Sequence, residues 1–218
     1  MPKDRSFQDR REAGRALAEL LGAHRAAAGT TPDLVVLGLA RGGVPVGAEI
    51  AAMLRAPLDV FVVRKLGVPQ WPELAMGAIA CDGAVVINEH VVHSLNVSTA
   101  QLLAVMDAET VELARREALY RGDRPRRELT AKTVILVDDG IATGSTMLAA
   151  VRAVRRSGPR RVIVAAPVGP RAVLEALADE ADDVVIAVVP ERFEAVGQAF
   201  VDFHQVSDDE VQIALAGT

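Results

Sequence analysis

Two adjacent carboxylates and three hydroxyl side chains follow one short apolar segment, and they are the residues of this chain best suited to chemistry. The segment 134–137 reads Val-Ile-Leu-Val, which is typical of a buried strand. It continues as Asp138, Asp139, Gly140, Ile141, Ala142, Thr143, Gly144, Ser145 and Thr146. From Leu148 on, apolar residues recur at helical spacing. A strand, a glycine loop and a helix in this order present backbone N–H groups and the positive end of a helix dipole, which suits a phosphate.

The two carboxylates narrow the choice of ligand. Asp138 and Asp139 are neighbours on an extended chain, so their side chains point to opposite sides and cannot both serve the core. Ionised carboxylates only accept hydrogen bonds, so they match a ligand with hydroxyl donors close to its phosphate. The pattern therefore favours a sugar phosphate with a vicinal diol. The alternative is an ordinary buried strand that ends in a polar turn.

Two other predicted strands end in basic residues. The strand 34–39 is followed by Ala40-Arg41-Gly42-Gly43, whose spacing does not match the dinucleotide fingerprint G-x-G-x-x-G. Arg41 beside two glycines can offer a guanidinium fork and bare N–H groups to an oxyanion. The strand 58–63 is followed by Arg64-Lys65-Leu66-Gly67, which out of context would be a solvated strand end. Because ligands of open α/β sheets bind at the carboxyl ends of strands, three such junctions together favour function.

Strands and helices alternate along the rest of the chain, which predicts a parallel sheet with helices on both faces in a single domain over residues 1–218. Apart from the motif strand and its helix, the expected helices cover 8–28, 43–55, 99–120 and 171–179, and the expected strands cover 34–39, 58–63, 75–80, 84–88, 161–168 and 183–189.

Composition limits the class of protein. Half of the 218 residues are apolar, but no apolar run approaches the length of a membrane span, and the N-terminus lacks a signal-peptide core. The net charge of -5 argues against binding to nucleic acid. A single cysteine, Cys81, excludes an internal disulfide and a zinc site built from cysteines. We therefore expect a soluble, cytoplasmic protein.

The motif 134–146 closely resembles the thirteen-residue phosphoribosyl-pyrophosphate (PRPP) motif of the type I phosphoribosyltransferases. Nearly the whole chain resembles a bacterial group of predicted phosphoribosyltransferases that share R-K-L-G, V-D-D-G-I-A-T-G and a D-F-x-Q tail, here 202–205. The resemblance implies a Rossmann-like central parallel sheet with helices on both faces and a small hood, which we expect from 190–218 and parts of 66–130. It also implies a glycosyltransferase of the pentosyltransferase class in nucleotide metabolism, transferring 5-phosphoribose from PRPP to a nitrogenous, nucleobase-like acceptor with release of pyrophosphate.

The resemblance also assigns roles to the three junctions. In the family, the acid pair holds the ribose 2- and 3-hydroxyls, which here would be the task of Asp138 and Asp139, and the loop 140–146 wraps the 5-phosphate. Pyrophosphate would be bound by Ala40, Arg41, Gly42, Gly43, Arg64 and Lys65. The family's flexible catalytic loop begins at the place of Arg64 and Lys65, so these two cations join the acid pair as catalytic candidates. Mg²⁺ would arrive with PRPP, without a metal site built by the protein alone.

The acceptor is the least specified part of the site. Enzymes for 6-oxopurines place an aspartate where this chain has Ala142, so Ala142 weighs against hypoxanthine and guanine, whereas the A-R-G-G loop leans toward them. Phe193, Phe200 and Phe203 are candidates to stack on a base, although packing in a core is the stronger expectation. A non-catalytic sensor of PRPP or nucleotides on the same fold remains the alternative, and a homodimer is left open.

Overall fold

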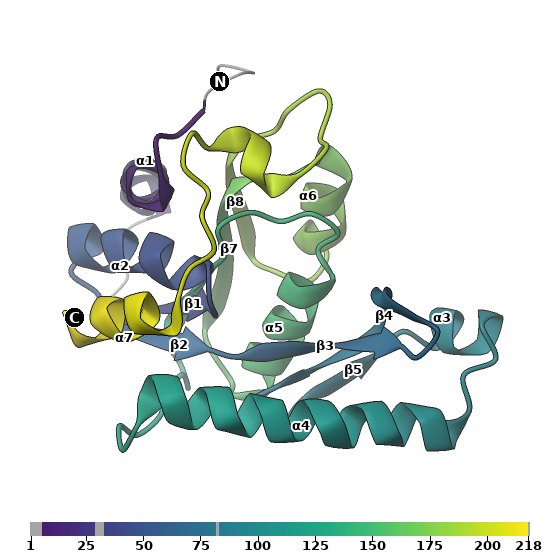
Figure 1. Cartoon of the computed structure of the whole chain (residues 1–218). Coiled ribbons are helices and arrows are strands. Elements are labelled where there is room, and N and C mark those ends of the chain that lie inside the picture. Colours follow the sequence, from purple (N-terminus) through teal and green to yellow (C-terminus); the bar gives the residue numbers. More distant parts are fainter. Residues whose placement is uncertain (1–5, 29–32, 82, 218) are drawn as a thin grey trace.

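The computed structural model describes residues 6–28, 33–81 and 83–217, and its centre is a five-stranded parallel sheet (Figure 1). The strand order is β2-β1-β6-β7-β8. Their bounds are Leu34–Leu39 for β1, Leu58–Phe61 for β2, Thr133–Val137 for β6, Arg161–Val168 for β7 and Asp183–Val188 for β8. Every residue of β1 and β6 is buried, since both faces of a parallel sheet are covered, and this explains their unbroken apolar sequence.

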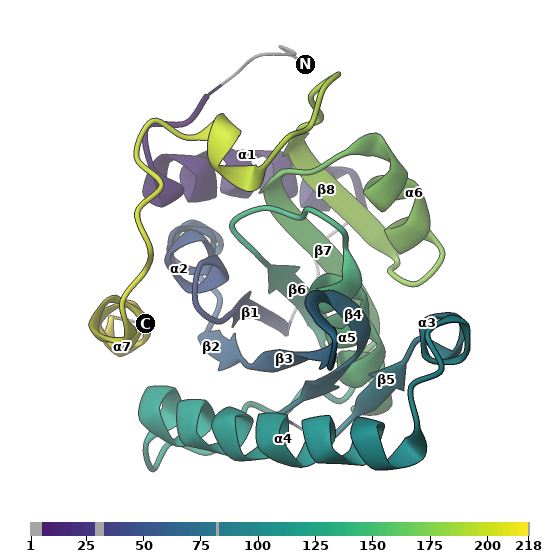
Figure 2. The same ribbon diagram turned by 45° about the vertical axis from the view of Figure 1, so that its right-hand side comes forward.

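Helices cover both faces of this sheet (Figures 1 and 2). On one face, α1 (Arg10–Ala28) packs on β7 and β8, and α2 (Gly43–Leu54) packs on α1, β1, β2 and β6. On the other face, α5 (Ser145–Arg156) contacts β6 and β7, and α6 (Arg171–Ala178) contacts β8. The predicted architecture is therefore confirmed. Gly29, the residue that follows the helix expected over 8–28, lies outside the described residues.

The chain leaves the parallel sheet after β2 and builds a second, antiparallel sheet in the order β3-β4-β5. These strands span Val63–Val68, Trp71–Ala80 and Val85–Ile87. The expectation of one strand over 58–63 followed by a loop is wrong, because Arg64-Lys65-Leu66-Gly67 lies within β3 and the connection to β4 comes only after Val68. Leu66 and Val68 are fully buried while Arg64 and Lys65 are half-buried, so these residues form a strand that is only partly covered.

Helix α4 (Thr99–Arg121), preceded by the short α3 (Glu89–Ser94), underlies the second sheet (Figure 1). It begins in a capping box between Ser98 and Gln101 and ends where Arg121 binds Asp59 of β2 at 2.7 Å. Arg121 also donates to the carbonyl of Val60, so the end of α4 is anchored on the parallel sheet. No helix in the described part of the chain is long and apolar enough to cross a membrane.

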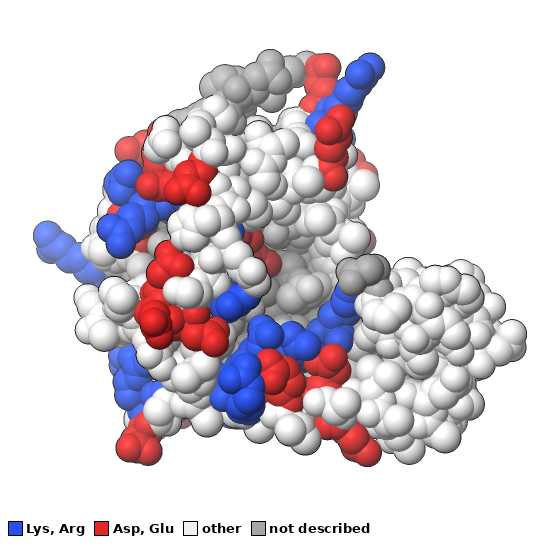
Figure 3. Space-filling model, viewed as in Figure 1, with Lys and Arg blue, Asp and Glu red and all other residues white. Residues whose placement is uncertain are grey.

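The C-terminal segment returns over the parallel sheet. After β8 it forms a 3-10 turn, η1 (Val196–Ala199), pairs Phe200 with Phe7 ahead of α1, and ends in α7 (Asp208–Ala216) beside α2 and α4 (Figures 1 and 2). Figure 3 shows that the face between this segment and the lobe of β3, β4 and α4 is hollowed, with basic side chains at its lower edge. The two parts expected to form a hood thus flank one hollow.

Candidate active site at the carboxyl ends of the parallel strands

The A-R-G-G loop and the acid pair are in direct contact. β1 and β6 are neighbours with Gly38 opposite Val137, so the loops that follow them lie side by side. A Cβ atom added to Gly42 would lie 2.0 Å from Oδ2 of Asp139, and one added to Gly43 would lie 2.2 Å from the carbonyl oxygen of Val137. Only glycine permits this approach. The structure therefore brings two of the three predicted junctions together.

The carboxylates of the acid pair lie in a poorly solvated environment. The backbone N–H of Asp139 donates to Oδ1 of Asp138 at 2.9 Å, while the N–H of Asp138 bonds to the carbonyl of Ala165 at 3.2 Å. Burial, together with the neighbouring charge of Asp139, raises the pKa of Asp138 well above its ordinary value. Burial also raises the pKa of Asp139, against the opposing effect of Arg10. A ligand that brings hydroxyl donors would relieve this unfavourable burial of charge.

Arg10, in the first turn of α1, is a residue of the site that sequence reasoning missed. Its Nε and Nη2 atoms each lie 2.8 Å from Oδ2 of Asp139, and Nη1 donates to the carbonyl of His204 at 2.8 Å. The guanidinium carbon sits 4.0 Å from the ring centroid of Phe203, in a cation–π contact. Arg10 belongs to no recognisable motif and lies 129 residues from Asp139 in sequence, so only the fold reveals the pair.

The predicted 5-phosphate loop is exposed at the start of α5. Gly144 precedes the helix with a φ of +79°, a conformation that favours glycine, and places no side-chain cap over the first turn. The side chains of Thr143, Ser145 and Thr146 are exposed, and Thr143 Oγ1 lies 3.3 Å from Ser145 Oγ. Ile141 is buried and anchors the loop by donating its N–H to Val168. The loop thus offers hydroxyls and helix N–H groups to an anion.

The predicted pyrophosphate-binding cations are held by carboxylates in this structure. Arg41, which follows a cis peptide bond from Ala40, has Nη1 3.7 Å from Oδ1 of Asp208 in α7. The Nε atom of Arg64 donates to Glu109 of α4 at 2.6 Å. That contact turns the Arg64 guanidinium toward α4, so a role on pyrophosphate would require it to leave Glu109. Lys65 follows Arg64 on β3 and therefore starts from the opposite face of the strand.

The aromatic residues proposed for the acceptor pack mainly on one another. Phe200 is 8% exposed, and its ring stacks on that of Phe203 with centroids 4.8 Å apart. Phe203 is covered in addition by Arg10, and Phe193 packs against the same apolar cluster. Stacking of Phe200 or Phe203 on a base therefore has no support, and the expectation of core packing fits the geometry. Ala142 is exposed beside the phosphate loop.

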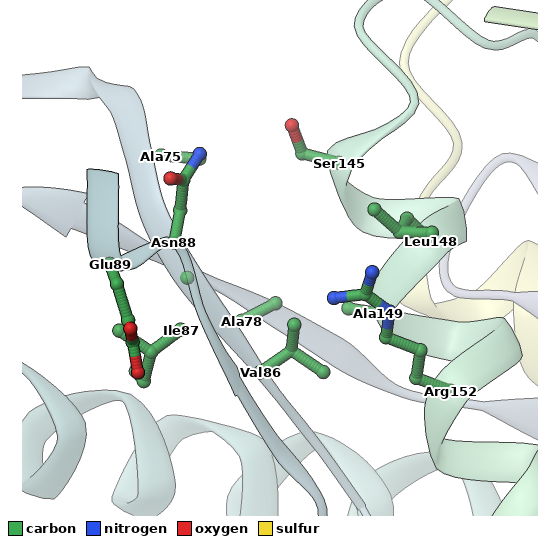
Figure 4. Close-up of a pocket in the computed structure, with 11 residues that line it drawn as sticks. Ala75, Ala78, Val86, Ile87, Asn88, Glu89, Ser145, Leu148, Ala149 and Arg152 are labelled. Atoms are coloured by element: carbon green, nitrogen blue, oxygen red, sulfur yellow. The ribbon is translucent and has the colours of Figure 1, made fainter. Parts of the chain in front are cut away.

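Two hollows border the second sheet. A pocket of about 440 Å³ lies between α5 and the strands β4 and β5, where Ser145 and Leu148 face Asn88 across the gap (Figure 4). Of the predicted site residues, only Ser145 lines it. A groove of about 520 Å³ separates β3 from α4 and is bordered by Arg64 and Lys65. Among the described residues, no three His, Cys, Asp or Glu side chains form a group that could hold a metal ion.

The glycine loops and the acid pair lie at the carboxyl edge of the parallel sheet, which is where open α/β proteins bind their ligands. A family model for the phosphoribosyl transferase domain matches residues 5–197. The chain is 48% identical over 205 residues to the Mycobacterium tuberculosis (strain ATCC 25618 / H37Rv) protein named "Putative phosphoribosyl transferase Rv0571c", and the alignment covers 94% of this chain and 45% of that protein. The chain therefore spans about half the length of this curated relative.

A solved structure agrees with this relationship. The crystal structure of TT1426 from Thermus thermophilus superposes with a TM-score of 0.83 at 40% sequence identity, over 97% of this chain and 98% of that one. The present chain belongs to the phosphoribosyl transferase family, and its architecture is the type I phosphoribosyltransferase fold.

Proposed function

We propose that the protein transfers 5-phosphoribose from PRPP to a nitrogenous, nucleobase-like acceptor and releases pyrophosphate. The observation that carries this proposal is the contact between Gly42 of the A-R-G-G loop and Asp139 of the acid pair. In PRPP the pyrophosphate is attached to the anomeric carbon, which is the neighbour of the carbon that bears the 2-hydroxyl. A diol site that touches an oxyanion site, with a phosphate loop at the end of the same strand, therefore matches the three polar groups of one substrate.

In this reaction the bond between the anomeric carbon and the pyrophosphate oxygen breaks, and its electron pair leaves with pyrophosphate. The acceptor nitrogen forms the new bond to that carbon with its lone pair and gives up its proton to the solvent. Asp138 and Asp139 accept hydrogen bonds from the ribose hydroxyls and stabilise the positive charge that develops on the ring. Arg41 and Lys65 offset the charge on the leaving pyrophosphate, and the N-terminus of α5 holds the 5-phosphate.

Magnesium fits this arrangement as part of the substrate. Mg²⁺ keeps several of its waters and is commonly held by substrate phosphates, so the cation would neutralise pyrophosphate without a protein cage. The chain's own cations then complete the neutralisation. Because Arg41 contacts Asp208 at 3.7 Å, binding of pyrophosphate exchanges one anionic partner of Arg41 for another.

The test is pyrophosphate release from PRPP and Mg²⁺ with pooled purines, pyrimidines and other nitrogen acceptors, beside a reaction without acceptor. Acceptor-dependent release supports the transferase, and splitting the pool names the substrate; Ala142 leads us to expect hypoxanthine and guanine among the poorer acceptors. Release without any acceptor would indicate hydrolysis instead. Calorimetric binding of PRPP without release would favour the sensor, and the double variant D138N/D139N should abolish binding in either case.

A further inference from the structure

Arg10 binds Asp139 of the acid pair through only one of its two carboxylate oxygens. Two of its nitrogen atoms, Nε and Nη2, contact the same carboxylate oxygen, Oδ2 of Asp139, at 2.8 Å each. Neither of these two contacts involves Oδ1 of Asp139. The side chains of both residues are largely buried, with 9% of Arg10 and 16% of Asp139 exposed. The side chain of Asp138 also interacts with that of Asp139. A carboxylate oxygen has more than one lone pair, so Oδ1 can still accept a hydrogen bond from a ligand while Arg10 fixes the direction of the group through Oδ2.

We propose that Arg10 is the positioning residue of the acid pair: it fixes Asp139 through Oδ2 so that Oδ1 accepts a hydrogen bond from a ribose hydroxyl. This inference rests on the proposed function, because it takes a ribose phosphate as the ligand of Asp139. Gly42 packs against the same carboxylate, since a Cβ added there would lie 2.0 Å from Oδ2 and 2.8 Å from Oδ1, so Asp139 is held by the A-R-G-G loop as well as by Arg10. A carboxylate held in this way loses little side-chain freedom when it binds a hydroxyl.

The C-terminal segment in turn fixes Arg10. Nη1 donates to the carbonyl of His204, and the guanidinium lies over the ring of Phe203, which is itself stacked on Phe200. The pocket beside Arg10 is bordered by further charged groups, namely Asp9, Arg11, Asp202, His204 and Glu210. The imidazole of His204 is bound by two of them, since Nδ1 lies 3.1 Å from Asp202 and Nε2 lies 2.9 Å from Glu210. The segment around residues 203–204 is thereby coupled to the acid pair through one side chain.

The opposite interpretation is that Arg10 merely neutralises Asp139 and must leave before the substrate binds. The two views predict opposite effects of Arg10→Met, a substitution that keeps an unbranched side chain but removes the guanidinium. A positioning role predicts that the affinity for PRPP falls by about tenfold or more, because a hydrogen bond to a charged group is lost or misdirected. Arg10→Lys, which restores the charge without the fork, should recover part of the loss. An unchanged or tighter affinity in Arg10→Met would overturn the proposal.

Two controls separate positioning from damage to the fold. Arg15→Met removes an arginine of the same helix whose contact, to Glu49 at 3.4 Å, is exposed, and it should leave PRPP affinity within about twofold. Pyrophosphate alone, as a probe of the A-R-G-G loop, should bind Arg10→Met with nearly the wild-type affinity. A parallel loss of pyrophosphate and PRPP binding would mean that Arg10 supports the whole site, and it would overturn a role specific to Asp139.

A measurement without any substrate distinguishes failure of this inference from failure of the proposed function. The carboxyl carbon of Asp139 can be followed by NMR through a pH titration and assigned by its disappearance in Asp139→Asn. Removal of Arg10 should move the midpoint of this titration to higher pH, because the guanidinium favours the ionised form. An unchanged midpoint would overturn the inference, even with intact PRPP binding. A wild-type protein that binds no PRPP would instead refute the proposed function, whatever the midpoint does.

Discussion

The contact between the A-R-G-G loop and the acid pair can be tested with one methyl group, through Gly42→Ala. Gly42 has φ -61° and ψ -33°, which is helical backbone that alanine adopts without strain. The added Cβ would lie 2.0 Å from Oδ2 and 2.3 Å from Cγ of Asp139. Real Cβ contacts stay beyond 3.0 Å, so the carboxylate must retreat by at least about 1 Å. Since Arg10 holds Oδ2 at 2.8 Å, Asp139 cannot retreat without changing that contact.

The size of the expected effect follows from the hydrogen bond that Asp139 would lose. A hydrogen bond to a charged group is worth about 1.5–3 kcal/mol, so PRPP affinity should fall roughly 10- to 150-fold. Crowding in a packed site should also lower the free energy of unfolding by about 1–3 kcal/mol. Gly47→Ala is the matched control within α2, because its Cβ would meet only the flexible end of Leu58 at 3.1 Å and side-chain or backbone atoms at ordinary distances.

Calorimetry with PRPP and Mg²⁺ measures the affinity, and urea unfolding measures the stability of each variant. We expect Gly47→Ala to bind PRPP as the wild type does, since its substitution leaves Asp139 in place. A folded Gly42→Ala protein with wild-type affinity for PRPP would refute the reasoning. It would mean either that the loop and the acid pair do not touch or that Asp139 does not bind the substrate.

Three further outcomes are expected. Asp138→Asn should raise the free energy of unfolding at pH 7 while removing PRPP binding. The pKa of this acid is higher in the folded than in the unfolded state, so the ionised carboxyl increasingly destabilises the fold as pH rises from about 4. Thermal unfolding measured across pH should therefore show that the gain in stability vanishes in acid. Asp59→Ala should cost about 1.5–3 kcal/mol in urea unfolding, because the buried guanidinium of Arg121 loses its nearer carboxylate at 2.7 Å and keeps only Glu117 at 3.4 Å. Glu112→Gln, which weakens exposed pairs with Arg115 and Arg116, should leave the unfolding midpoint almost unchanged. Gly144→Ala should destabilise by about 1–2 kcal/mol, because alanine is strained at a φ of +79°, and chemical unfolding will show it.

The parallel sheet was predictable because its strands carry a strong local signal. The apolar runs in β1, β6 and β7 are buried on both faces, and each is followed by a glycine turn or a helix. The antiparallel sheet was harder to predict. In β3 only Leu66 and Val68 carry the alternating pattern, and Arg64, Lys65 and Gly67 between and before them are more typical of a loop.

The residues of the candidate site were likewise predictable only where a local sequence pattern brings them together. Residues that lie next to one another in sequence, such as Asp138 and Asp139, could be found because one loop places them together. Arg10 could not be found, because its role depends on a contact between α1 and the end of β6 that no local pattern records. The aromatic cluster behaved likewise: Phe200 and Phe203 were recognisable as a group, but only the fold shows that Arg10 covers one of their rings.

Three of the charged groups expected to contact PRPP, Asp139, Arg41 and Arg64, are already paired in the described structure. Arg10 neutralises Asp139, Asp208 contacts Arg41, and Glu109 binds Arg64. A partly buried charge without a partner would be unfavourable, so these pairs make the site stable before substrate arrives. Under the proposed function, PRPP would exchange partners at Arg41, and at Arg64 if that residue takes part, while Asp139 would keep Arg10 and still offer Oδ1. The binding free energy of PRPP is therefore a difference between two sets of ion pairs, and mutation of Asp208 or Glu109 should alter it without touching the substrate.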